Sequence, residues 1–102
     1  MTKPSRVAAT LSLARKAGKL TIGFMATKNA ITDRKALLVI LTSDISESTE
    51  KKIMQVIEDM PILKIKTTGD DIEAVMKRRF VVASITDINL KELFLKAVEE
   101  DI

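Results

Sequence analysis

The stretch that decides the fold is Ala36-Leu37-Leu38-Val39-Ile40-Leu41, a run of apolar residues in the middle of a 102-residue chain. Side chains of a β-strand alternate between its two faces, so a run without polar residues indicates that both faces are covered. The run is much shorter than the roughly 20 residues that a membrane-spanning helix needs. It therefore predicts a central strand with helices packed above and below it.

Helical and strand patterns alternate on both sides of this strand. We expect one domain over residues 1–102, because two domains in this length would each be too small to bury a core. The alternation predicts an α/β fold whose largely parallel or mixed sheet lies between helical layers. The predicted helices begin near Pro4, span 24–32, follow an N-cap at Asp44 or Ser46 and run up to Pro61, follow a cap formed by residues 68–71, beginning with Thr68, and begin near Asn89. The other predicted strands span 20–22, 62–66 and 81–85. We expect Arg15 on the outer face of the first helix, Ile57 and Met60 in the buried stripe of the helix that ends at Pro61, and Leu93 in the apolar face of the last helix.

The composition excludes several classes of chemistry. The chain contains no cysteine, which excludes disulfides and thiolate metal sites, and no histidine, the commonest metal ligand and proton shuttle. We therefore expect no cofactor, no metal, no small-molecule substrate and no enzymatic activity. The first residues lack the apolar core of a secretion signal, so we expect a cytoplasmic protein without a membrane partner.

Positive charge is concentrated in the first third of the chain. Residues 1–36 carry eight Lys or Arg and one acidic residue, whereas residues 37–102 carry nine basic and thirteen acidic residues. This asymmetry predicts a face for a polyanion, which means a nucleic acid or an acidic partner. The alternative is ordinary solubilising charge.

Two segments are candidates for that face. Gly23 opens a predicted helix whose free amides can bind an anion, with Lys19 before it and Lys28 and Asn29 on its exposed side. The densest basic run is Lys77-Arg78-Arg79, which precedes the last predicted strand. The alternatives are a turn that only needs a small residue and a solvated loop. Because the chain has only three aromatic residues, structured RNA is a better ligand than an unpaired strand.

Two acidic residues, Asp44 and Asp87, follow predicted strands, where α/β proteins often place reactive groups. Each also precedes a predicted helix, whose free amides it can cap. We favour capping, because no partner base is visible in the sequence. A third interpretation, with the least support, is a signalling domain that is phosphorylated at Asp44.

Several segments in combination resemble the kink-turn-binding ribosomal protein family, and the likeness extends over nearly the whole chain. It is greatest to the small bacterial branch of YlxQ- and YbxF-type ribosomal-protein-like proteins. The segments are Leu11-Ser-Leu-Ala-Arg-Lys-Ala-Gly-Lys-Leu20, Ile22-Gly-Phe-Met-Ala-Thr-Lys-Asn-Ala-Ile31, Lys35-Ala-Leu-Leu-Val-Ile-Leu-Thr-Ser-Asp44, Ser48-Thr-Glu-Lys-Lys-Ile53 and Val81-Val-Ala-Ser-Ile-Thr-Asp87.

The resemblance implies a three-layer α/β/α sandwich around a four-stranded mixed sheet. It also implies binding to a sharply bent RNA helix, with the basic loop beside the start of the second helix. The family reads RNA there with a pattern of Gly, any residue, Asn, Glu, two residues and Lys. Gly23 matches the glycine, but Met25 and Ala26 occupy the Asn and Glu positions, and Asn29 occupies the Lys position.

Our hypothesis is a non-enzymatic, ribosome-associated protein that binds kink-turn-like or ribosomal RNA, with ribosome-associated proteins as further partners. The alternative is a protein-interaction module on the same fold, with Met25 and Phe24 as an adhesive patch. The residues that we expect at the RNA are Lys19, Gly23, Phe24, Met25, Ala26, Lys28, Asn29, Thr32, Lys77, Arg78 and Arg79.

Overall fold

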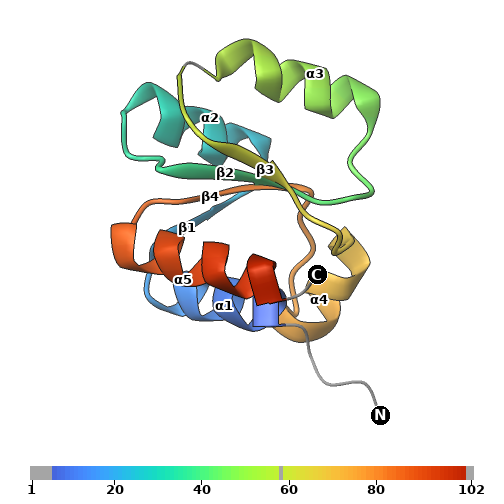
Figure 1. Ribbon diagram of the computed structural model, residues 1–102. Helices are drawn as coiled ribbons and strands as arrows, with labels where there is room; N and C mark the ends of the chain where they lie inside the picture. Colours follow the sequence, from blue (N-terminus) through green and yellow to red (C-terminus); the bar gives the residue numbers. More distant parts are fainter. Residues whose placement is uncertain (1–5, 58, 101–102) are drawn as a thin grey trace.

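A computed structural model describes residues 6–57 and 59–100. Helices and strands alternate along these residues in the predicted order (Figure 1). The predicted helix start near Pro4 lies outside the described residues. The elements are α1 (Arg6–Lys16), β1 (Leu20–Ile22), α2 (Phe24–Thr32), β2 (Leu38–Leu41), α3 (Glu47–Val56), β3 (Ile62–Lys64), α4 (Gly69–Met76), β4 (Val82–Ile85) and α5 (Ile88–Glu100).

The four strands form one mixed sheet in the order β1-β4-β2-β3. Strand β4 is antiparallel to both of its neighbours, β1 and β2, whereas β2 and β3 are parallel. Strands β1, β2 and β3 therefore all end at the edge of the sheet where β4 begins. We call this edge the Gly23 edge, because Gly23 directly follows β1.

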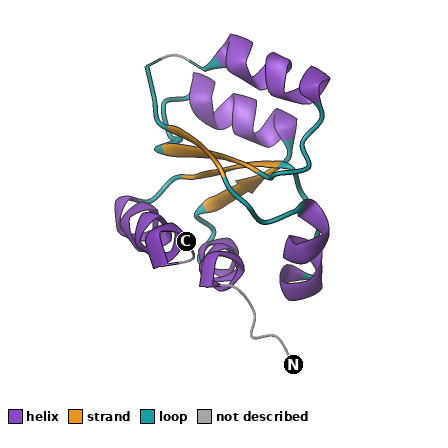
Figure 2. Cartoon of the chain, turned by 45° about the vertical axis from the view of Figure 1, so that its right-hand side comes forward, coloured by secondary structure: helices purple, strands orange, loops and turns teal. Residues whose placement is uncertain are grey.

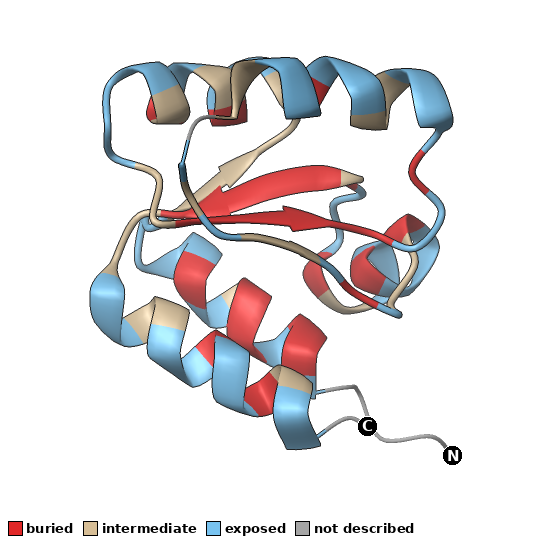
Figure 3. Ribbon diagram, turned by 45° about the horizontal axis from the view of Figure 1, so that its top comes forward, coloured by how far each residue is buried: buried red, intermediate tan, exposed pale blue. Residues whose placement is uncertain are grey.

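Helices cover both faces of the sheet. Helices α2 and α3 lie on one face and α1, α4 and α5 on the other, which confirms the predicted three-layer sandwich (Figures 1 and 2). The apolar run of β2 explains this arrangement: Leu38 and Ile40 belong to the core on the α1, α4 and α5 side, and Val39 and Leu41 belong to the core on the α3 side. Buried residues accordingly occupy the two central strands, β2 and β4, and the inner faces of the helices (Figure 3).

The structure corrects three details of the predicted elements. Helix α3 ends at Val56, short of Pro61, because Ile57 has an extended backbone and Asp59 a positive φ of 38°. Ile57 and Met60 still pack against the core, but they do so from the turn after α3. Their helical spacing in the sequence therefore did not reflect a helix. Strand β3 ends at Lys64, two residues early. Leu93, expected in the buried face of α5, is 45% exposed.

Candidate nucleic-acid interface

The N-terminus of α2 presents unpaired backbone amides at the Gly23 edge. Gly23 is its N-cap and has no side chain with which to accept a hydrogen bond. Thr27 donates the first helical bond, to the Gly23 oxygen, so the amides of residues 24–26 have no acceptor within the helix. The φ of 92° and ψ of 167° at Gly23 belong to a region that only glycine readily adopts. A Cβ there would meet no atom within 4 Å, so an approaching ligand can reach the backbone.

A cluster of hydroxyl groups holds the first turn of α2 on the sheet. The Thr21 hydroxyl lies 2.6 Å from that of Ser84 and 3.1 Å from that of Thr27. The Ser84 backbone N–H also donates to the Thr21 hydroxyl at 3.1 Å. Thr27 and Ser84 are completely buried. These bonds join β1, β4 and α2, and so they set the position of the amides at the start of α2.

One backbone hydrogen bond joins this helix start to the first residue of β4, which directly follows the basic loop. The Gly23 N–H donates to the Val82 carbonyl oxygen at 2.8 Å, directly beyond the paired residues Ile22 and Ala83. Val82 is also the residue with which β4 begins, immediately after the loop of residues 77–81. The start of α2 and the end of the basic loop are therefore neighbours, although about sixty residues separate them in the sequence.

The beginning of the loop is basic and exposed. Lys77 ends α4 in the left-handed conformation, with a φ of 61°, and both Lys77 and Arg78 are exposed. The Arg15 guanidinium of α1 donates to the Met76 carbonyl oxygen at 2.8 Å, which places a third cation at the start of the loop. Sequence reasoning put Arg15 on the outer face of α1 but missed this contact, because no local pattern links residues so distant.

The third cation of the basic run, Arg79, is paired with acidic side chains. Its Nη2 lies 3.0 Å from Asp44 Oδ2, and its Nε lies 3.1 Å from Asp70 Oδ1. Hydrogen bonding to the Asp70 carboxylate raises the pKa of Arg79. Asp44 also accepts the Gly69 N–H at 2.9 Å, and this bond, assisted by the charge of Arg79, lowers the pKa of Asp44 from its ordinary value.

Of the two acidic residues predicted to cap the helix that follows them, Asp87 does so and Asp44 does not. Asp87 accepts the Leu90 N–H at 3.0 Å and so caps α5 as predicted. Asp44 does not cap α3, because Ser46 accepts the Thr49 N–H and occupies that position. Asp44 instead reaches across the Gly23 edge to the first amide of α4. The predicted cap of α4 is confirmed, since Thr68 and Asp71 form a reciprocal capping box.

The remaining predicted residues lie in different places. Met25 is 63% exposed and Ala26 is exposed beside it, and Lys28 and Asn29 follow one turn later. Phe24 is only partly exposed and packs against the core below α3, so it does not form an apolar patch with Met25. Two residues lie away from the start of α2, and their contact with RNA stays a prediction. They are Thr32, at the other end of α2, and Lys19, whose carbonyl accepts from Thr86 beyond the opposite end of β4.

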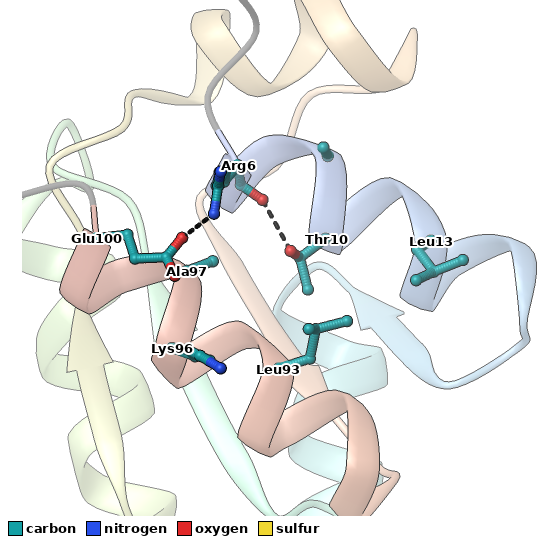
Figure 4. Close-up of a pocket in the computed structure, with 8 residues that line it drawn as sticks. Arg6, Thr10, Leu13, Leu93, Lys96, Ala97 and Glu100 are labelled. Atoms are coloured by element: carbon teal, nitrogen blue, oxygen red, sulfur yellow. Dashed lines mark hydrogen bonds and ion pairs between the residues drawn. The ribbon is translucent and has the colours of Figure 1, made fainter.

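A separate groove of about 360 Å³ lies between α1 and α5, on the other side of the sheet from α2 (Figure 4). Leu13 and Leu93 border it, and the ion pair between Arg6 and Glu100 closes one end. None of the predicted RNA-binding residues lines this groove.

The described residues hold no group of three acidic side chains arranged to bind a metal. Within the same residues, no helix is both long and apolar enough to cross a bilayer.

Residues 5–93 match the family described as the ribosomal protein L7Ae/L30e/S12e/Gadd45 family. The chain belongs to this family. The match extends from α1 into α5 and so contains every strand of the sheet and both segments of the candidate interface. No curated protein matches the sequence.

Solved structures share the fold of this L7Ae-family protein. A protein of unknown function from Bacillus halodurans is 20% identical, with a TM-score of 0.79, and the match covers 95% of this chain and 99% of that one. A 15.5 kD RNA-binding protein from Giardia lamblia is 18% identical, with a TM-score of 0.70, and the match covers 93% of this chain and 83% of that one. At these identities, the likeness shows the fold alone.

Proposed function

We propose that this L7Ae-family protein is a non-enzymatic binder of structured RNA, and that the RNA lies across the Gly23 edge. The observation that carries the proposal is the bond between Gly23 and Val82, which joins the uncapped start of α2 to the first residue of β4, directly after the basic loop. The structural likeness to an RNA-binding protein and the excess of basic residues in the first third of the chain support it. On this proposal, the RNA is a kink-turn-like or ribosomal RNA and the protein is a cytoplasmic, ribosome-associated member of the YlxQ/YbxF-type branch.

The start of α2 supplies a phosphate site in this proposal. Backbone amides without acceptors and the positive end of the helix dipole together favour an anion. Gly23 adds no side chain that would hold the anion away from the amides. Lys28, partly exposed one turn into the helix, supplies a formal positive charge, and Asn29 beside it supplies an amide.

The basic loop supplies the second contact, on the opposite strand of the RNA. Lys77 and Arg78 are exposed and have no acidic partner in the described part of the chain. When an unpaired lysine or arginine contacts a phosphate, it releases a counterion from the RNA. The affinity for RNA therefore falls as the salt concentration rises. Phosphate contacts at two separated points orient an RNA by its shape and require no base recognition.

Recognition of bases is weak in this proposal. Met25 is the most exposed large apolar side chain in the described part of the chain, and neither it nor Ala26 can form a hydrogen bond with a base edge. The alternative, a protein-interaction module, has less support at this edge. Phe24 turns toward the core, and an isolated exposed methionine does not make an apolar patch.

The proposal is tested by measuring binding to a kink-turn RNA and to a straight duplex of equal length over a series of salt concentrations. We expect tighter binding to the kinked RNA and a logarithmic slope of roughly 0.7–0.9 for each phosphate contacted. The double variant Lys77→Ala/Arg78→Ala removes two exposed cations from the loop. It should weaken binding about tenfold and reduce the slope by nearly two.

The matched control is Lys51→Ala/Lys52→Ala, which removes two exposed neighbouring cations from α3. This control should leave both the affinity and the salt slope nearly unchanged. An equal loss of affinity in the two double variants would contradict the proposed interface. Binding that does not respond to salt would contradict the proposed function itself.

A further inference from the structure

Arg79 lies at the centre of a network that joins three segments at the Gly23 edge. Its guanidinium contacts Asp44, which follows β2, and Asp70, in the first turn of α4. Asp44 in turn accepts the first amide of α4, from Gly69. One arginine thus ties the loop before β4 to the loop after β2 and to the start of α4.

The backbone next to Arg79 packs tightly against the start of α4. A Cβ on Gly69 would lie 2.9 Å from the Phe80 carbonyl oxygen and 3.1 Å from Arg79 Cζ. The end of the loop therefore lies directly on the start of α4, with no room for a side chain between them. Phe80 itself is buried in the core on the α1, α4 and α5 side. The basic loop is thus anchored at its end, whereas Lys77 and Arg78 remain exposed at its beginning.

We infer that Arg79 is a positioning residue, which holds the loop of residues 77–81 in place through Asp44 and Asp70 so that Lys77 and Arg78 face the RNA. This inference rests on the proposed function. The positioning role takes the place of the expectation that Arg79 itself contacts a phosphate of the RNA. A guanidinium whose Nε and Nη2 already donate to two carboxylates has fewer donors for a phosphate, and the two carboxylates repel a phosphate that approaches it.

The two roles predict opposite effects of removing an acidic partner. If Arg79 contacted a phosphate, Asp44→Asn would release the guanidinium and remove a repelling charge, so RNA binding would tighten. If Arg79 positions the loop, the same substitution removes one of its anchors, so binding weakens. Asparagine keeps an oxygen for the Gly69 N–H, which limits the damage to the start of α4.

The experiment measures RNA affinity and its salt slope for Asp44→Asn, Arg79→Gln and Arg79→Lys. We expect each variant to bind about three- to tenfold more weakly, because a mobile loop must be ordered on binding. The salt slope should stay unchanged, since no phosphate contact is lost. Arg79→Lys is informative because it keeps the charge but lacks the planar fork that reaches two carboxylates.

Two control variants separate this role from general effects. Glu73→Gln removes an exposed acidic charge from the same helix without breaking a bond to Arg79, and it should bind RNA as well as the wild type or better. Ile53→Val removes one methyl group from the core on the α3 side, and it should lower the melting temperature with little effect on RNA affinity. The inference is overturned if Asp44→Asn tightens binding, or if Arg79→Gln reduces the salt slope by about one.

Hydrogen exchange of the free protein separates the failure of this inference from the failure of the proposed function. Arg79→Gln should speed the exchange of the amides in residues 77–81 and leave those of β2 unchanged. If the wild type shows no salt-dependent RNA binding, the proposed function fails, yet this exchange still tests the anchoring. Unchanged exchange in the loop would overturn the inference even if RNA binds.

Discussion

The guanidinium of Arg15, in α1, donates a hydrogen bond at 2.8 Å to the carbonyl oxygen of Met76, the last residue of α4. The carbonyl groups at a helix C-terminus lack partners within the helix and carry partial negative charge, so a cation stabilises them. This contact fixes the point at which the basic loop leaves α4. Together with Arg79, it holds the loop at both ends.

Arg15→Ala should lower the free energy of unfolding by about 0.5–1.5 kcal/mol, because the Met76 carbonyl loses its donor. RNA binding should weaken as well, since the loop loses the anchor at its beginning. The control is Lys16→Ala, which removes an exposed cation from the next residue of α1. Denaturant unfolding and RNA titration of both variants make the comparison. Equal effects from the two substitutions would show that only the net charge matters.

Gly69→Ala should destabilise the protein by about 1–3 kcal/mol, although alanine is the better helix former. The added methyl would lie 2.9 Å from the Phe80 carbonyl oxygen, so the loop must move away from α4. RNA affinity should fall with stability. The comparison variant is Gly18→Ala. Gly18 has a φ of 72°, which strains an alanine, but the added methyl would meet no atom within 4 Å. It should lower stability and leave RNA affinity intact, as measured by thermal melting and titration.

The double variant Met25→Asn/Ala26→Glu should gain affinity for a kink-turn RNA. It restores hydrogen-bonding groups at the exposed start of α2, where each well-formed pair with a base contributes about 1–3 kcal/mol. Affinity for a straight duplex should not rise, because the glutamate adds negative charge. Competition between the two RNAs measures the ratio of the affinity for the kink-turn RNA to the affinity for the straight duplex. If this ratio stays at the wild-type value, the bases of a kink-turn do not reach residues 25 and 26.

The stability of the protein should depend on the ionisation of Asp44. The Gly69 N–H and the Arg79 charge hold the pKa of Asp44 below its ordinary value of 3.8 in the folded state. A carboxylate of this kind stabilises the fold above its unfolded pKa, and this contribution is lost as the pH falls through the folded pKa. The wild type should therefore be more stable than Asp44→Asn near neutral pH, and the difference should shrink below about pH 4. Urea unfolding at pH 7 and pH 3 checks this. A constant difference would mean that Asp44 acts through packing alone.

Element order and layering were predictable because the signals that set them are local. The apolar run that ends in β2 alternates between the two cores, and the caps at Thr68 and Asp87 form as predicted. The errors arose where two local signals competed. Both Asp44 and Ser46 have N-cap spacing, and the sequence contains no sign that Asp44 is drawn to a helix that begins 25 residues later.

What the sequence by itself determined was the fold and the segments in which the proposed RNA-binding residues lie, because strand alternation and helix capping act over a few neighbouring residues. Only the tertiary structure decided which cations of the basic run are paired with acidic side chains. Lys77, Arg78 and Arg79 are consecutive and chemically alike, but Arg79 alone meets two carboxylates, since the strand crossings bring Asp44 and Asp70 to the edge where β4 begins. Ion pairs between residues distant in the sequence depend on how the strands and helices are arranged in space, and the local spacing of residues does not reveal this arrangement.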